Sequence, residues 1–140
     1  MSERVLVRFA TLDDTQFVSQ DQYISAEIVR RKIEWHEVMV AEQNKCVVGY
    51  LRLEYLWSTI PYIALIRVIP ECRRQGVSRA ILDFLEGYLR SQGHKMFYSS
   101  SQADEREPQE WHRRMGFEEC GLITEINKGS VGELFFRKRL

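Results

Sequence analysis

The sequence predicts a mixed α/β fold in which a strand, a long amphipathic helix and a second strand follow one another near the middle of the chain. Residues 62–69 are apolar on both faces, which is typical of a central strand. Residues 77–88 then repeat apolar side chains at helical spacing, and residues 96–98 return to a strand pattern. A crossover of this kind places its two strands parallel to one another.

The composition indicates a single globular domain over residues 1–140. A chain of 140 residues has a common size for one domain, and 44% hydrophobic with 29% charged residues is ordinary globular composition. Twenty basic and twenty acidic side chains cancel. This balance argues against a nucleic acid or an anionic membrane as partner, so an anion site would have to be local.

We expect a cytoplasmic protein with reduced thiols. No apolar run approaches the ~18 residues of a membrane span, and residues 1–4 lack the pattern of a signal peptide. The three cysteines, Cys46, Cys72 and Cys120, are widely spaced and contain no C-x-x-C pair. That spacing argues against a disulfide framework and against a zinc site.

Two helices are expected after a first strand. Residues 5–9 alternate as a strand does, and residues 11–14 offer an N-cap with acid in the first turn of a helix. Ser25 can cap a second helix that runs to about residue 36. The expected apolar face of this second helix consists of Ile28, Val29, Ile33 and Trp35.

An antiparallel hairpin precedes the central strand. Residues 38–41 and 46–53 flank a polar turn at residues 43–45. Pro61 is expected to close the next turn, and Pro70 to end the central strand because proline has no N–H for the ladder.

The remaining elements are the long helix, a short helix and two strands. Gly93 lies where the long helix should stop, and a helix over about 108–115 should end at Gly116. Two further strands should flank the turn at residues 127–130. The apolar positions of the long helix are Val77, Ala80, Ile81, Phe84, Leu85 and Tyr88.

The turn between the central strand and the long helix has the features of an anion site. The first N–H groups of a helix have no intrahelical partner, and the helix dipole adds partial positive charge there. Gly76 removes a side chain where an anion would approach the backbone, and Arg73, Arg74 and Arg79 can add charge-assisted bonds. A solvated basic turn with no ligand is the equally good alternative from the turn alone.

The same turn resembles the R/Q-x-x-G-x-G/A signature of the GNAT superfamily of N-acetyltransferases. Arg73, Gly76 and Ser78 fill it, with serine in place of the last small residue. Downstream, residues 111–117 (WHRRMGF) resemble the F-Y-x-x-x-G-F segment of the family. The two matches occur in the expected order within a β/α pattern that covers the whole chain.

The resemblance implies a twisted mixed sheet of about six or seven strands with flanking helices. The strand at 62–69 and the strand at about 95–99 would splay apart and admit the pantetheine arm of acetyl-CoA. Main-chain groups at 66–68 would contact pantetheine, and those at 74–79 would surround the pyrophosphate. The expected cofactor-binding residues are Ile66, Arg67, Val68, Arg73, Arg74, Gln75, Gly76, Val77, Ser78 and Arg79.

The resemblance also points to a proton donor. His112 occupies the position where the family commonly has a tyrosine that protonates the leaving thiolate, and imidazolium can donate a proton near neutral pH. A helix-surface histidine without a task is the alternative, and Tyr98 is a weaker rival for the role. The family's asparagine that contacts pantetheine is replaced by Glu105.

The general base and the acceptor pocket have only weak candidates. Glu54 and Tyr62 lie at strand ends on the expected substrate side, and a solvated edge position is the alternative for Glu54. Tyr55 and Trp57 can wall an acceptor pocket or simply pack in the core. Cys72 is not expected to be a nucleophile, because direct transfer needs no acyl-enzyme.

These features together predict an acyltransferase that moves an acetyl group from acetyl-CoA to a primary amine by direct attack in a ternary complex, without a metal. The acceptor would be a small molecule or a peptide amine. One alternative is a CoA-binding sensor or structural module that lacks turnover, and another is a phosphate-binding β/α domain of a different family. The sequence does not fix the acceptor, the acyl chain length or the oligomeric state, for which a homodimer is one option.

Overall fold

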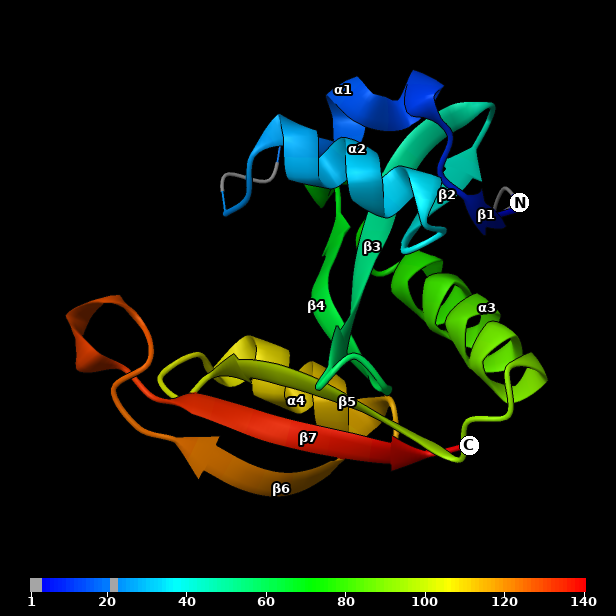
Figure 1. Ribbon diagram of the computed structural model, residues 1–140. Helices are drawn as coiled ribbons and strands as arrows, with labels where there is room; N and C mark the ends of the chain where they lie inside the picture. Colours follow the sequence, from blue (N-terminus) through cyan, green and yellow to red (C-terminus); the bar gives the residue numbers. More distant parts are fainter. Residues whose placement is uncertain (1–3, 21–22) are drawn as a thin grey trace. The chain divides into compact units, whose positions relative to one another are not determined.

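A computed structural model describes residues 4–20 and 23–140, and its strands form one seven-stranded sheet in the order β1-β2-β3-β4-β5-β7-β6 (Figure 1). The sheet is mostly antiparallel, but β4 and β5 pair in parallel with Tyr62 opposite Tyr98. The predicted mixed α/β fold and its central crossover are therefore confirmed. The strands are β1 (Leu6–Phe9), β2 (Val38–Gln43), β3 (Cys46–Leu56), β4 (Ile60–Val68), β5 (Met96–Gln102), β6 (Glu118–Ile123) and β7 (Glu133–Arg139). The helices are α1 (Thr15–Val18), α2 (Ala26–Glu34), α3 (Val77–Ser91) and α4 (Arg106–Arg114), with 3-10 turns at Leu12–Asp14, Pro70–Cys72 and Lys128–Ser130.

The chain divides into two compact units. The first contains the residues up to Leu53 together with Leu65–Tyr88, and the second contains Glu54–Ala64 together with Leu89–Leu140. The chain crosses between the units inside β3, β4 and α3. The single domain over 1–140 stays a prediction. Among the described helices, none is long and apolar enough to cross a membrane.

Helices α1 and α2 pack on one face of the strands in the first unit. Alternate residues of β2 point toward these helices, as the period of a strand requires. The expected apolar face of α2 was too wide, because Ile28 is 43% exposed and Trp35, which follows the last helical residue, is 67% exposed. The buried residues of this cluster are Ala10, Val18, Val29, Ile33, Val38, Val40 and Tyr50.

Helix α3 contacts β1 and β3 in the same unit. Phe9 lies edge-on to Phe84 and Tyr88, with ring centroids 5.4 and 5.0 Å apart. A Cβ added at Gly49 would lie 2.9 Å from the carbonyl oxygen of Arg67 and 3.4 Å from Cδ1 of Ile81. Only glycine allows β3 to approach the end of β4 this closely.

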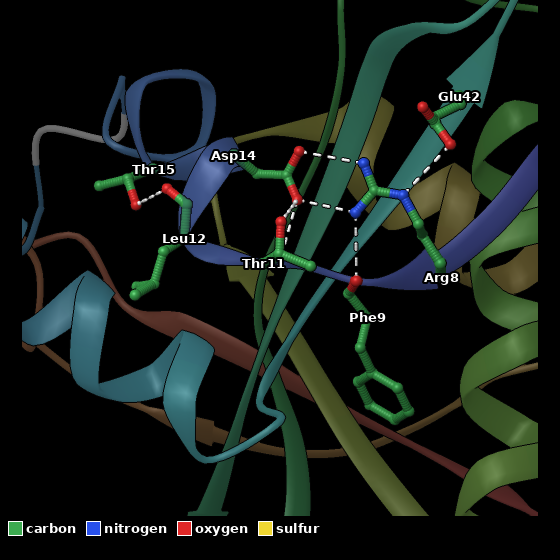
Figure 2. Close-up of polar contacts among 7 residues, drawn as sticks. All are labelled: Arg8, Phe9, Thr11, Leu12, Asp14, Thr15 and Glu42. Carbon is green, nitrogen blue, oxygen red and sulfur yellow. Dashed lines mark hydrogen bonds and ion pairs between the residues drawn. The ribbon is translucent and has the colours of Figure 1, made fainter.

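A buried carboxylate fixes the entry into α1 (Figure 2). Asp14 accepts hydrogen bonds from Nη1 and Nη2 of Arg8 at 2.7 and 3.1 Å, and from the backbone N–H of Thr11 at 2.8 Å. Arg8 also donates through Nε to Glu42 at 3.2 Å. The bonds from Arg8, followed by that from Thr11, outweigh burial and lower the pKa of Asp14. The predicted acid in this first turn is thus a structural anchor.

The two hairpin turns both use left-handed backbone at residues other than glycine. Asn44 and Lys45 have φ of +55° and +62° between β2 and β3, within the predicted turn. Trp57 and Ser58 have φ of +50° and +65° between β3 and β4. The prediction that Pro61 closes this second turn is wrong: Pro61 is buried as the second residue of β4, near a strand start, where proline is tolerated.

In the second unit, α4 covers one face of β5 and β7 (Figure 1). The register places Ser99 opposite Phe136 on the α4 side and Ser100 opposite Phe135 on the other side. Helix α4 begins at Arg106, two residues before the predicted start, and it ends before Gly116, whose φ is +92°. All six residues of β6 are exposed.

Candidate functional site

The predicted anion site is an exposed turn at the start of α3. Arg74 and Gly76 both have left-handed backbone, with φ of +62° and +82°, and the N–H of Ala80 donates to the Gly76 carbonyl oxygen at 3.0 Å. A Cβ added at Gly76 would have no other atom within 4 Å. The space next to this glycine is therefore open.

The charged side chains of the turn are exposed, and two polar side chains hold its shape. Nε of Arg73 donates to the carbonyl oxygen of Val68 at 3.1 Å, and Nε2 of Gln75 donates to that of Glu71 at 3.2 Å. Arg73 therefore ties the turn to the end of β4. The cost of this arrangement is that the Val68 carbonyl, one of the groups predicted to contact pantetheine, already accepts a bond.

The first N–H groups of α3 are the strongest anion-binding feature of the turn. They have no partner within the helix, and they carry the positive end of its dipole. Arg74 and Arg79 are exposed beside them and can bond phosphate oxygens. The residues present fit a pyrophosphate, although the assignment of each residue in 73–79 stays a prediction.

The end of β4 carries a second polar feature, at Arg67. Burial raises the pKa of the Tyr50 hydroxyl, and the charge and hydrogen bond of Arg67 partly oppose this effect. The Arg67 side chain is thus placed near Tyr50, while its carbonyl oxygen lies against Gly49. The predicted main-chain contacts of 66–68 with pantetheine are not tested by these features.

His112 lies in the core of the second unit. Its exposed fraction is 3%, and its ring lies parallel to the Phe136 ring with centroids 4.4 Å apart. Nδ1 is 2.7 Å from the carbonyl oxygen of Pro108, and Nε2 is 2.7 Å from Oγ of Ser99. Because a carbonyl can only accept, Nδ1 carries the proton and Nε2 accepts from the Ser99 hydroxyl.

This environment keeps the imidazole neutral. Burial, with a smaller contribution from the charge of Arg113, outweighs the Pro108 carbonyl and lowers the pKa of His112 to about 4. A neutral ring with both nitrogens bonded in the core is poorly prepared to donate a proton near neutral pH. The geometry favours a structural role, and proton donation by His112 stays a prediction that this environment does not support.

The aromatic candidates lie at different places in the second unit. The hydroxyl of Tyr98 contacts the sulfur of Met96 at 3.5 Å. Tyr55 lies beside His94, with ring centroids 6.1 Å apart. Trp57, at the tip of the hairpin, is 83% exposed. An exposed indole at a left-handed position is available to a ligand, whereas Tyr55 is half-buried.

The remaining candidates show no catalytic contact. Glu105 is exposed at the N-cap position of α4, where its side chain makes no capping bond. Glu54 is half-buried at the end of β3. Cys72 is a free thiol, as are Cys46 and Cys120.

A hydrogen-bonded chain that the sequence did not reveal runs from β4 across β5 to β7. The hydroxyl of Tyr62 is 2.5 Å from Oγ of Ser100, which donates to Oε2 of Glu133 at 2.5 Å. Nδ2 of Asn127 donates to Oε1 of Glu133 at 2.9 Å. Tyr62 was a candidate, but Ser100 and Glu133 were missed because the strand was expected to end near residue 99. The polar alternation of 98, 100 and 102 was the available signal.

The order of the sheet and the open turn before α3 agree with the resemblance to the acetyltransferases. Residues 7–117 match the acetyltransferase (GNAT) family, and this chain belongs to that family. It is therefore an enzyme of the acetyltransferase class. The family that the turn and the downstream segment suggested is thereby confirmed.

Solved structures show the same fold over nearly the whole chain. Ard1 from Thermoplasma volcanium has a TM-score of 0.84 and 18% identity, with 97% of each chain covered. Ribosomal-protein-alanine N-acetyltransferase from Brucella melitensis has a TM-score of 0.80 and 22% identity, covering 96% of this chain and 99% of the other. The yncA protein from Salmonella typhimurium, solved with its cofactor acetyl-CoA, has a TM-score of 0.77 and 17% identity, covering 97% and 94%. No curated protein matches the chain.

Proposed function

We propose that this chain transfers the acetyl group of acetyl-CoA to a primary amine by direct attack in a ternary complex. The observation that carries the proposal is the exposed turn at the start of α3, where Gly76 is left-handed and faces open space. Membership of the acetyltransferase (GNAT) family supports the same reaction. Holding thioester and amine together converts a bimolecular attack into a local one.

In this proposal, the segment from the end of β4 to the start of α3 binds acetyl-CoA. The N–H groups of residues 74–79 bind the pyrophosphate, with Arg74 and Arg79 supplying charge. Main-chain groups of residues 66–68 align the pantetheine arm. When bound, acetyl-CoA supplies the thioester, and the chain contributes position and hydrogen bonds. No metal has a role in this scheme.

The acceptor is proposed to be a small molecule or a peptide amine. A ribosomal-protein-alanine N-acetyltransferase from Brucella melitensis has the same fold, which supports an acceptor on a protein as one of the two classes. The hairpin tip of this chain presents Trp57 with 83% of its side chain exposed, and an aromatic surface of this kind can contact either class of acceptor. A panel of both classes is therefore the appropriate screen.

Binding of the cofactor is tested with two matched glycine variants. Gly76→Val places a side chain at the turn, and Gly93→Val places the same side chain after the other end of α3. Both glycines have left-handed backbone, with φ of +82° and +86°, and a Cβ added at either one would meet no other atom within 4 Å. The backbone strain caused by valine should therefore be similar at the two positions. Calorimetry should show acetyl-CoA binding to the unaltered protein and to Gly93→Val, and little or none to Gly76→Val. Arg73→Ala should weaken binding less than Gly76→Val. Equal affinities for both glycine variants would contradict the proposed site.

Turnover is tested separately, by following thiol release from acetyl-CoA across the amine panel. Release that depends on one of the amines supports the proposal. A second candidate function is a CoA-binding module without turnover, which the buried and fully bonded His112 favours. Tight acetyl-CoA binding with no amine-dependent release would support that module and contradict the enzyme.

A further inference from the structure

The hydrogen-bonded chain of Tyr62, Ser100 and Glu133 lies on the face of β5 and β7 opposite α4. We propose that Tyr62 accepts the proton of the attacking amine, and that Ser100 passes a proton on to Glu133. Tyr62 is then the group that touches substrate, whereas Ser100 and Glu133 are positioning residues that act through it. This inference rests on the proposed acetyl transfer.

The donors and acceptors fix the direction of the hydrogen bonds from Tyr62 to Glu133. Ser100 has a single hydroxyl proton, and it donates that proton to Oε2 of Glu133. Its contact with Tyr62 must therefore be one in which Tyr62 donates. Both O···O distances are 2.5 Å, which is the short end of the range for a hydroxyl that donates to the carboxylate of Glu133, and for one hydroxyl that donates to another between Tyr62 and Ser100.

The two ends of the chain are held by neighbours in the same unit. Asn127 donates to the second carboxylate oxygen of Glu133 at 2.9 Å and to the Gly132 carbonyl at 3.3 Å. The ring of Tyr62 stacks on Phe135 at 5.8 Å between centroids. The residues directly opposite Glu133 are Gln102 on β5 and Ile123 on β6, and neither is ionisable.

The position of Tyr62 along β4 suits this role. Tyr62 is the third residue of β4, the strand whose other end leads into the turn before α3, and it pairs with Tyr98 of β5. The proposal places the attacking amine at the Tyr62 hydroxyl, at the head of the hydrogen-bonded chain.

The proton transfer balances without any further reagent. The amine nitrogen bonds to the acetyl carbon, and the carbon–sulfur bond breaks to release the CoA thiolate, which takes a proton from water. The amine proton moves to the Tyr62 oxygen, the Tyr62 proton moves to Ser100, and the Ser100 proton moves to Glu133. Glu133 ends as the carboxylic acid and returns its proton to water after product leaves.

The test compares three variants that each interrupt the relay with two matched controls. Tyr62→Phe, Ser100→Ala and Glu133→Gln remove one member each, and the glutamine still accepts a bond from Ser100. Ser101→Ala is the serine control on the same strand, and Glu118→Gln is the carboxylate control on β6. Each protein is assayed with the best amine of the panel, together with acetyl-CoA affinity by calorimetry and the melting temperature.

We expect each relay variant to lower kcat by roughly 10²-fold, the lower end of the range for lost acid–base catalysis, with acetyl-CoA affinity unchanged. The controls should keep the unaltered rate. The double variant Tyr62→Phe/Glu133→Gln should be no slower than Tyr62→Phe alone, because the members act as one unit. In mixtures of H₂O and D₂O, the rate of the unaltered protein should depend on the deuterium fraction along a curve, since several protons move together. That curvature should become a straight line in Ser100→Ala.

The outcomes separate this inference from the function on which it rests. Unaltered kcat in all three relay variants, or a straight line for the unaltered protein, would overturn the relay while leaving acetyl transfer in place. Loss of rate that only follows loss of melting temperature, with full additivity in the double variant, would also overturn it. Absence of any amine-dependent transfer by the unaltered protein would overturn the proposed function and the relay together.

Discussion

The two faces of the β5–β7 ladder hold similar residues in different surroundings. On the α4 face, the ring of His112 bonds Ser99 and stacks on Phe136, and it is closed off from solvent. On the opposite face, the ring of Tyr62 bonds Ser100 and stacks on Phe135, and its hydrogen bonds end on Glu133. One residue of register separates the two serines. A shift of one position along a strand therefore distinguishes a side chain that stabilises the core from one that can take part in proton transfer.

The largest expected difference between the faces is in the free energy of unfolding after loss of an aromatic ring. Phe136→Ala should cost about 3–5 kcal/mol, because Phe136 is fully buried and its removal leaves a cavity beside His112. Phe135→Ala should cost roughly half as much or less, since Phe135 is only half-buried and water can fill the space. Urea unfolding of both variants measures this difference, and equal costs would show that the two faces are packed alike.

The next effect is the pH dependence of stability that His112 contributes. Its pKa is about 4 in the folded state and about 6.5 when unfolded, so on acidification the unfolded chain binds the proton first. The stabilisation is complete above pH 6.5 and is lost as the pH falls to about 4. The loss should be about 3 kcal/mol, at about 1.4 kcal/mol per tenfold change in proton affinity. Urea unfolding across this range should show the loss in the unaltered protein and a flatter profile in His112→Phe.

The same His112→Phe variant tests the predicted role in proton donation. If kcat falls by roughly 10²-fold while acetyl-CoA affinity and folding are retained, His112 reaches the thiolate despite its burial. If His112→Phe folds, is less stable and keeps the rate of the unaltered protein, the role of His112 is to stabilise the core.

A smaller effect, in a different pH window, is expected from Asp14. Asp14→Asn should cost about 2 kcal/mol at pH 7, because it removes the charge that Arg8 pairs with in a largely buried site. The folded pKa of Asp14 is lowered, so its stabilisation is present above the unfolded value of about 3.9 and is lost as the pH falls through the folded pKa. The loss between pH 6.5 and 4 should therefore survive in Asp14→Asn. Its disappearance would mean that the histidine is not its source.

The smallest effect on stability is expected from the open face. Tyr62→Phe and Ser100→Ala should each lower the free energy of unfolding by about 1 kcal/mol or less, since water can replace a lost partner at a half-buried site. Thermal and urea unfolding measure this cost. A loss as large as that of Phe136→Ala would show that the relay supports the fold, and it would make any fall in kcat hard to assign to chemistry.

The sequence predicted the order and type of the elements well, because each depends on local signals. The apolar repeat of α3, the glycine that follows it and the two-sided apolar run of β4 are all readable from spacing alone. The errors concerned the exact ends of elements, which depend on contacts with other parts of the fold. Trp35 fits the apolar repeat of α2 but follows its last residue, and Pro61 lies inside β4 instead of in the turn.

The candidate site was only partly predictable for the same reason. The turn before α3 could be located because its signals, Gly76 and the arginines on either side of it, are close together in the sequence. His112 matched a family position, yet its burial depends on Phe136 and Ser99, which are far away in the sequence. The partnership of Ser100 with Glu133 depends on the register of β5 against β7, over a separation of 33 residues, and no local pattern specifies that register.

The hairpin tip between β3 and β4 has a consequence for engineering. Trp57 and Ser58 occupy left-handed positions that Asn-Gly would fill with less strain, so replacing the pair should make the protein harder to melt. The indole that the exchange removes is the most exposed of the large hydrophobic side chains in the described residues, at 83%. Comparing acceptor preference between the unaltered protein and the Asn-Gly variant therefore tests the contribution of the indole without a loss of stability.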